Sequence, residues 1–552
     1  MRLRKKERPQ GDFISRTIKN PLAQCAGVLS YAIILIMRIP LIETIGDTGV
    51  GLFAPAFELV FLITLFTSYG MTGAMSGIIR YRVKREQYRN AKRVLRAAVF
   101  LDLIIGVAAA VFIVIFSSVI ANIFVLESLS RMAVMASATV LIFAAFIGTF
   151  RGYFNGYGLG MLTAHSQYLE SIATVICVLF CSGLFYERGV KIAALKQSET
   201  LAYAYGAMGA MLGMMLSRII TTIHLLMMYV IYAGTLRGKL GMDNSKRMET
   251  QYYLQRMILE NSVPIALVAI MSNVVMLVDQ RMFNYCMNKL EMGETRTAQW
   301  GSFYGKFAVF VGVGAVIGVL GVYNMTGRIG GAYEREEYRA MRERIGRAVR
   351  KLSMVAFPAA IYMAVLASAV ASLFFGENDE LVSWLQRGTA IIVLYGFCFL
   401  FAQILYKTHM MRELLLTTLL SLLIHVLVAY LLVQRMYLGA DGVIYSLIIF
   451  FAVYAALNFF FIGRNLKYRQ EWIGGVIFPA AAAGVSGVVV GLVNAVLLEP
   501  LGAGLTILIG VLVGLLLYVT FLMILRVIGE AELSRMPLGF FFIMLGKNIG
   551  VL

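Results

Sequence analysis

The sequence predicts an all-α membrane protein of about fourteen transmembrane helices, built as two six-helix lobes followed by a C-terminal helix pair. Of the 552 residues, 60% are hydrophobic and only 14% are charged, and the mean hydropathy is +0.80. The apolar residues form continuous runs of about 20 residues, the length that a helix needs to cross a bilayer core. Because these runs do not alternate like barrel strands, helices are the expected spanning structure.

The apolar runs follow one another along almost the whole chain. A basic N-terminal segment, residues 1–19, precedes the first run, which is too long for the core of a cleaved signal peptide. We therefore expect an uncleaved first span and a cytoplasmic N-terminal segment. The expected spans are 20–44, 52–79, 97–122, 132–150, 161–185, 201–232, 261–287, 299–325, 352–375, 386–406, 412–434, 440–462, 474–497 and 502–527.

The positions of lysine and arginine set the expected orientation. With the N-terminus inside, most of the 49 basic residues fall in inward-facing segments, as cytoplasmic loops require. An even number of spans returns the C-terminus to the cytoplasmic side. The net charge of +19 is thus explained by these loops, and no nucleic-acid partner is expected.

A short motif occurs in both halves of the chain. Residues 85–89 (REQYR) are matched by residues 335–339 (REEYR), and each copy follows the second span of a half. Transporters are often built from such repeats, with substrate bound between them. The predicted organisation is an N-lobe of spans 1–6, a cytoplasmic linker, a C-lobe of spans 7–12, spans 13–14 and an interfacial tail, at 20–232, 233–260, 261–462, 463–530 and 531–552.

Five charged residues within the spans are candidate substrate-binding residues: Arg38, Glu58, Asp279, Arg281 and Lys306. A charged residue at the centre of a membrane costs about 2.5–3.5 kcal/mol on insertion scales, so such residues face a protein interior or a watery cavity. Internal pairing, such as Arg38 with Glu58, is the structural alternative. Glu170 and Arg218 also lie in spans, and we expect them to be structural because they lie near bundle contacts or span ends.

The cations favour an anionic ligand. Spans 1, 2, 7 and 8 are the first pairs of the two halves; if those pairs face each other, Arg38, Arg281 and Lys306 line one positive chamber. Asp279 and Arg281 are two residues apart, so they point in different directions on a helix. Guanidinium groups bind phosphate oxygens in bidentate geometry and ammonium groups bind them as point charges. A diphosphate therefore suits this chamber better than a cationic drug does.

No enzyme or cofactor motif is evident. The chain has no Walker A motif, and Gly312-x-Gly314-x-x-x-Gly318 lies within an apolar span rather than after a strand. The five cysteines and four histidines form no metal-ligand spacing. We therefore expect a non-enzyme without metal or cofactor.

Several motifs resemble the bacterial polysaccharide-export proteins related to stage V sporulation protein B. That family is part of the superfamily of multidrug, oligosaccharidyl-lipid and polysaccharide exporters, and is related to the lipid II flippases. Asp279 stands where the family has an acid in span 7. The motifs that carry the resemblance are Arg38-Ile-Pro-Leu, Ile45-Gly-Asp-x-Gly-x-Gly-Leu52, Arg89-Asn-Ala-Lys-Arg-Val-Leu95, Arg151-Gly-Tyr-Phe-Asn-Gly-Tyr-Gly158 and Thr163-Ala-x-Ser-Gln-x-x-Glu170.

The resemblance implies alternating access without ATP in the bacterial cytoplasmic membrane. It also implies a lipid-linked saccharide as substrate, such as an undecaprenyl-diphosphate oligosaccharide or a peptidoglycan precursor. Arg38 is the position that best matches a diphosphate-holding arginine of the lipid II flippases, and spans 13 and 14 would form a groove for the lipid tail. The chain departs from the family by lacking prolines after Gly70, at Leu162 and near Gly314.

Two other functions stay open. A multidrug cation antiporter of the same superfamily would need a carboxylate in its cavity, for which Glu58 or Asp279 could serve. A non-transporting scaffold of an envelope-synthesis complex would need no substrate site. The sequence also leaves open whether a coupling ion is sodium or a proton.

Overall fold

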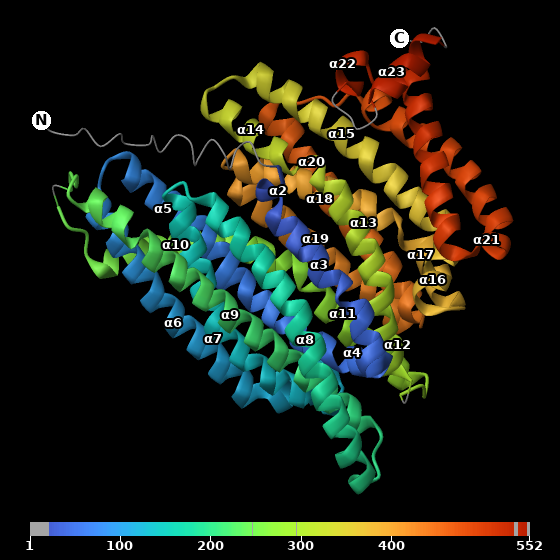
Figure 1. Ribbon diagram of the computed structural model, residues 1–552, viewed down its shortest axis with the longest axis horizontal. Helices are drawn as coiled ribbons and strands as arrows, with labels where there is room; N and C mark the ends of the chain where they lie inside the picture. Colours follow the sequence, from blue (N-terminus) through green and yellow to red (C-terminus); the bar gives the residue numbers. More distant parts are fainter. Residues whose placement is uncertain (1–20, 246, 294, 535–538, 549–552) are drawn as a thin grey trace, which may run out of the picture. The chain divides into compact units, whose positions relative to one another are not determined.

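The structure is a computed structural model that describes residues 21–245, 247–293, 295–534 and 539–548 (Figure 1). The predicted basic segment 1–19 lies outside these residues. The described residues are helical or lie in connections between helices, and none of them is in a strand. The chain divides into two compact units, Met1–Gly305 and Lys306–Leu552.

The first unit is a bundle of long helices. Its longest helices, of 37 and 41 residues, follow one another as a hairpin, and both are longer than the bilayer core is thick. The elements are α2 (Pro21–Gln24), α3 (Ala26–Ile36), α4 (Arg38–Thr64), η1 (Leu65–Gly70), α5 (Met71–Lys84), α6 (Tyr88–Val119), η2 (Ile120–Val125), η3 (Ser128–Ser130), α7 (Arg131–Gly156), α8 (Gly160–Lys196), α9 (Thr200–Leu240), α10 (Gln251–Asn273), α11 (Val275–Lys289) and α12 (Arg296–Ser302).

The second unit begins inside the eighth predicted span. Its connection to α12 is the π-helical segment η4 (Phe303–Phe307). The elements that follow are α13 (Ala308–Leu320), α14 (Tyr323–Glu334), α15 (Tyr338–Val365), α16 (Ala367–Phe375), α17 (Asp379–Gly388), α18 (Ala390–Lys407), α19 (Met411–Ala429), η5 (Tyr430–Arg435), α20 (Gly439–Leu466), η6 (Ile473–Ile477), α21 (Phe478–Ile524), α22 (Glu530–Leu533) and α23 (Gly539–Asn548).

The helix count agrees with the predicted number of spans. In the described part of the chain, 12 segments are long and apolar enough to cross a membrane. Two of them, Ala26–Lys84 and Ile473–Ile524, hold 59 and 52 residues, more than twice what one crossing needs. Each is interrupted by a glycine with positive φ, Gly46 (67°) or Gly502 (73°), and Figure 1 shows α21 as two antiparallel helices. Counting each as two crossings, the segments account for the predicted total of about 14.

The sequence repeat has a matching backbone in each unit. Glu86 and Glu336 both adopt the left-handed conformation, with φ of 57° and 61°. The next amide in each copy donates a hydrogen bond of 2.9 Å to a carbonyl five residues earlier, Gln87 to Arg82 and Glu337 to Ala332. Each corner therefore ends one helix and starts the next in the same way, as expected of equivalent positions in two repeats.

The connection between α9 and α10 is fixed to the corner between α5 and α6. Asp243 accepts a hydrogen bond of 2.8 Å from the amide of Arg89, which caps the first turn of α6. Arg82 is buried and donates two bonds of 2.8 Å to the carboxylate of Glu249. The predicted linker, 233–260, thus belongs to the first unit, and its residues outside α9 and α10 are 241–250.

Candidate functional site

Arg38 lies at a break between two helices of the first predicted span. Helix α3 ends at Ile36 and α4 begins at Arg38. Pro40 fits the first turn of α4, where its missing amide donor is not needed. The Arg-Ile-Pro-Leu motif therefore starts a helix and carries Arg38 at its first position, with only 3% of the residue exposed.

The guanidinium of Arg38 is held by the side chain and backbone of Tyr304. Arg38 Nη2 donates to Tyr304 Oη at 2.7 Å, and Nη1 donates to the Tyr304 carbonyl oxygen at 3.3 Å. The hydroxyl of Tyr304 in turn donates to Glu58 Oε1 at 2.6 Å. Arg38 and Glu58 are 3.9 Å apart at their nearest atoms. The structure thus brings these two predicted residues together and joins them through a tyrosine that sequence reasoning missed.

Tyr304 and Lys306 both belong to η4, a π-helical turn within the eighth span. Such turns occur often at functional sites because the extra residue in the turn redirects side chains. Lys306 is buried, and its ammonium group lies 5.1 Å from the centre of the Phe375 ring. The π-helical turn therefore sets the directions of the Tyr304 and Lys306 side chains, where the family that the sequence resembles has a proline bend.

Asp279 and Arg281 lie on α11. Asp279 is completely buried and Arg281 is partly buried, consistent with their pointing in different directions. The neighbouring Asn284 donates a hydrogen bond of 2.7 Å to the carbonyl oxygen of Val125, which fixes α11 against the end of η2. The predicted binding roles of Asp279 and Arg281 stay predictions.

The contact between α12 and α4 is tightly packed. A Cβ atom added to Gly301 would overlap the carbonyl oxygen of Asp47, and one added to Gly51 would overlap that of Thr297. Beside this contact, Glu127 accepts hydrogen bonds from Arg296 at 3.1 Å and from the Thr297 hydroxyl at 2.7 Å. The two glycines let α12 and α4 touch backbone to backbone, and the ion pair fixes the end of α12.

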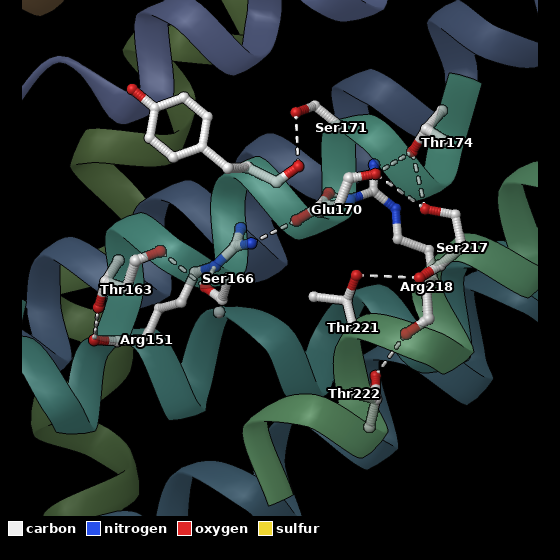
Figure 2. Close-up of polar contacts among 12 residues, drawn as sticks. Arg151, Thr163, Ser166, Glu170, Ser171, Thr174, Ser217, Arg218, Thr221 and Thr222 are labelled. Carbon is white, nitrogen blue, oxygen red and sulfur yellow. Dashed lines mark hydrogen bonds and ion pairs between the residues drawn. The ribbon is translucent and has the colours of Figure 1, made fainter. Parts of the chain in front are cut away.

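A second charged cluster lies between α7, α8 and α9. Figure 2 shows the carboxylate of Glu170 between the guanidinium groups of Arg151 and Arg218. Arg151 Nη2 lies 2.5 Å from Glu170 Oε2, and Arg151 Nε donates to Ser166 at 2.9 Å. Two cations share one anion, and Arg218 Nε has no partner among the described residues. The sequence placed Arg151 just beyond span 4, but α7 continues to Gly156 and so carries Arg151 inside the helix.

Asp102 is a further buried acid that sequence reasoning missed. It lies on α6 and is fully buried. The signal was present, because Asp102 is a single acid within the apolar run Val99-Phe-Leu-Asp-Leu-Ile-Ile105. No group of three or more metal-ligating side chains is found within the described residues.

These features define a class: a multi-pass helical membrane protein with charged side chains enclosed by its spans. Solved structures share this fold. The "Lipid II flippase MurJ, inward closed conformation" matches with a TM-score of 0.65 and 13% identity over 91% of this chain and 98% of that chain. An inward-facing multidrug resistance MATE family transporter of the MOP superfamily matches with a TM-score of 0.58 and 17% identity over 81% of this chain and 98% of that chain.

The chain belongs to the family described as Polysaccharide biosynthesis protein, which matches residues 23–324. Among curated proteins it is similar to Stage V sporulation protein B of Bacillus subtilis (strain 168), with 25% identity over 169 residues. That match covers 31% of this chain and 33% of the relative, so it spans about a third of the relative's length. The family resemblance and the all-α membrane fold predicted from the sequence are both confirmed.

Proposed function

We propose that this protein is a flippase that moves a lipid-linked saccharide across the bacterial cytoplasmic membrane by alternating access. The substrate would be an undecaprenyl-diphosphate oligosaccharide or a peptidoglycan precursor. Membership in the polysaccharide biosynthesis family supports a saccharide substrate. The fold that the chain shares with a lipid II flippase and with MATE transporters supports translocation rather than enzymatic chemistry.

The single observation that carries this proposal is the environment of Arg38. Its guanidinium is buried, and its Nε donor has no partner among the described residues. Glu58 lies 3.9 Å away and receives its hydrogen bond through Tyr304 rather than directly from the arginine. Arg38 thus keeps capacity for an acceptor, and a diphosphate could bind it in bidentate geometry. Glu58 balances the arginine's charge when no diphosphate is present.

We predict that Arg281 and Lys306 also contact the diphosphate. We also predict that Asp279 is a residue of the substrate site. In this proposal both termini lie in the cytoplasm and the spans contact membrane lipids. A membrane potential would assist outward movement of an anion by about 2.3 kcal/mol per charge for each 100 mV. A sodium or proton gradient could add to this force.

The test uses purified protein in liposomes that contain an undecaprenyl-diphosphate oligosaccharide. The wild type should move this lipid between leaflets, and Arg38→Ala should abolish the movement. Arg38→Lys should restore it only in part, because an ammonium group keeps the charge but cannot bind two phosphate oxygens in a fork.

Arg256→Ala is the matched control. Arg256 is an exposed arginine that pairs with Glu260 on α10, so its loss should leave the rate unchanged. Wild-type transport by Arg38→Ala would contradict the proposed role of Arg38. Binding of an envelope-synthesis enzyme without lipid movement under any gradient would instead indicate a scaffold.

A multidrug cation antiporter is the second candidate. The likeness to MATE transporters and the complete burial of Asp279 favour it, because a cation carrier needs a carboxylate in its cavity. Ethidium efflux that depends on Asp279, together with absence of lipid movement, would support this candidate over the flippase.

A further inference from the structure

Asp102 is fully buried and has one hydrogen-bond partner among the described residues. The Thr149 hydroxyl of α7 donates a hydrogen bond to Asp102 Oδ2. Asp102 Oδ1 is buried and has no hydrogen-bond partner among the described residues. The other face of α6 points outward from the unit, as the exposed Phe100 and Ile104 show. A carboxyl group therefore lies inside a membrane-spanning helix with half of its hydrogen-bonding capacity unused.

Several ionisable side chains on the surrounding helices are engaged with other partners. Within the described residues, no cation forms an ion pair with Asp102. The nearest basic residue on its own helix is Arg96, about 9 Å away along the axis by helix rise. Other ionisable groups on these helices include Arg82 of α5 with Glu249, Arg151 of α7 and Arg218 of α9 with Glu170, Arg256 with Glu260 on α10, Tyr229 of α9 against Tyr153, Arg131 at the start of α7, and His224 of α9.

This environment suits a proton better than a metal cation. An unpaired carboxylate in a membrane interior is costly, and a bound proton removes the charge. A sodium ion would need a shell of several oxygens to replace its water, whereas the one hydrogen-bond contact of Asp102 among the described residues is a single hydroxyl group. Among the two coupling ions that the sequence left open, the geometry at this position favours the proton.

Thr149 joins Asp102 to an irregular segment of the second span. The preceding residue, Gly148, packs so closely on η1 that an added Cβ would lie 2.5 Å from the Cα of Ser68. The hydroxyl of Thr72 also donates a hydrogen bond of 2.9 Å to the Gly148 carbonyl oxygen. Because η1 is a π-helical turn, it is a natural place for span 2 to bend. Bending there would displace α7 and thus the partner of Asp102.

We propose that Asp102 is a proton-binding site through which a proton gradient drives the transport cycle. The carboxyl group holds a proton while α6 and α7 pack as they do here. When α7 moves with η1, water on one side of the membrane reaches Asp102 and accepts the proton. In the opposite-facing state, water on the other side returns a proton to the carboxylate before the helices pack again as they do here. This inference rests on the proposed flippase function for its role in transport, but the proton site can be tested separately.

Infrared difference spectroscopy of the purified protein during a pH titration tests the site directly. The wild type should show the carbonyl band of a protonated carboxylic acid, which disappears as the pH rises. Asp102→Asn should remove this band, and Glu260→Gln, a change at an exposed acid, should retain it. Thr149→Val should shift the frequency of the band because it removes the one hydrogen bond that Asp102 receives among the described residues. This test remains available where the Asn variant fails to fold. A band that is absent, unaffected by both variants, or unchanged up to the pH of unfolding would overturn the proposal.

The transport assay tests coupling. Liposomes with an undecaprenyl-diphosphate oligosaccharide should show several-fold faster lipid movement under a pH gradient, but not under a sodium gradient. Asp102→Asn should still equilibrate the lipid and lose the response to pH. An unchanged response in Asp102→Asn would overturn proton coupling at this site. If the wild type moves no lipid, the flippase proposal and the transport role of Asp102 fail together, while the infrared titration still decides whether Asp102 binds a proton.

Discussion

The guanidinium of Arg38 lies over the ring of Tyr304, with 3.8 Å between Cζ and the ring centre, and also donates to the hydroxyl of the same tyrosine at 2.7 Å. One side chain thus supplies both a cation–π contact and a hydrogen bond. The hydroxyl also donates to Glu58, so Tyr304 determines how closely the buried cation and its carboxylate approach.

Replacing Tyr304 with phenylalanine should separate these two contributions. The ring contact to Arg38 would remain, but Arg38 and Glu58 would each lose a buried hydrogen-bond partner. We expect a loss of about 1–3 kcal/mol in the free energy of unfolding, measured by thermal melting in detergent. Tyr285→Phe, at a tyrosine that is 41% exposed, should change the stability by no more than about 0.5 kcal/mol. Equal effects of the two changes would contradict the bridging role of Tyr304.

The packing of α12 on α4 predicts a conformational effect of Gly301→Ala. The added methyl group would overlap the Asp47 carbonyl oxygen and push the two helices apart. A cysteine introduced at Thr297 should then react several-fold faster with a membrane-impermeant thiol reagent added from outside. The strain should also cost about 1–3 kcal/mol of stability.

Gly77→Ala on α5 is the matched control for that experiment. Apart from the adjacent backbone of its own helix, no described part of the chain lies within 4 Å of the Cβ position at Gly77, so alanine should stabilise this helix slightly. Labelling at Thr297 should stay at its original rate. Unchanged labelling in Gly301→Ala as well would show that the glycine contact does not hold α12 in place.

Replacing Glu170 and replacing Arg218 should lower the free energy of unfolding by different amounts. Glu170→Gln would leave the guanidinium groups of Arg151 and Arg218 facing each other without an anion, at a cost of about 3–5 kcal/mol. Arg218→Met would leave a balanced pair of Arg151 and Glu170 and should be much milder. Thermal melting of both variants in the same detergent checks this order. A more severe effect of Arg218→Met would indicate that Arg218, rather than Glu170, organises the cluster.

The sequence predicted the class, the number of crossings and the repeat because these depend on composition and spacing alone. Membrane thickness fixes the length of a span, and the matched corners at Glu86 and Glu336 follow from the same residues in both copies. The possible pairing of Arg38 with Glu58 was also foreseeable, because few oppositely charged groups occur in the first two spans.

Tyr304 and Asp102 were harder to identify. Tyr304 reaches Arg38 because η4 is π-helical, and no proline or glycine pattern announces that extra residue. Asp102 is prominent in its apolar run, but its lack of a cationic partner depends on which faces of α5, α7, α9 and α10 surround α6. Such facts depend on helix rotation and packing, which hydrophobic periodicity does not fix in spans that are apolar on all sides.

The connection fixed by Asp243 predicts a local dependence on pH. Partial desolvation works to raise the pKa of Asp243, but hydrogen bonds from the Arg89 amide and from Ser245, together with the charge of Arg89, lower it below its usual value. Because the pKa is lower in the folded state, the stabilisation is complete above the unfolded value of about 3.9 and is lost as the pH falls through the folded value. Hydrogen exchange at 241–250 and in the first turn of α6, corrected for intrinsic rates, should therefore accelerate only in acid.

Asp243→Asn should accelerate this exchange already at neutral pH, since the amide keeps the shape of the cap but not its charge, and acid should add little more. Glu337→Gln is the control from the second copy of the repeat. Its carboxylate also has a lowered pKa, because Arg335 donates to it, so its loss should affect exchange around 335–338 and leave 241–250 unchanged. Acid-accelerated exchange at 241–250 that persists in full in Asp243→Asn would assign the pH dependence to another acid, with Glu249 and its bond to Arg82 as the next to replace.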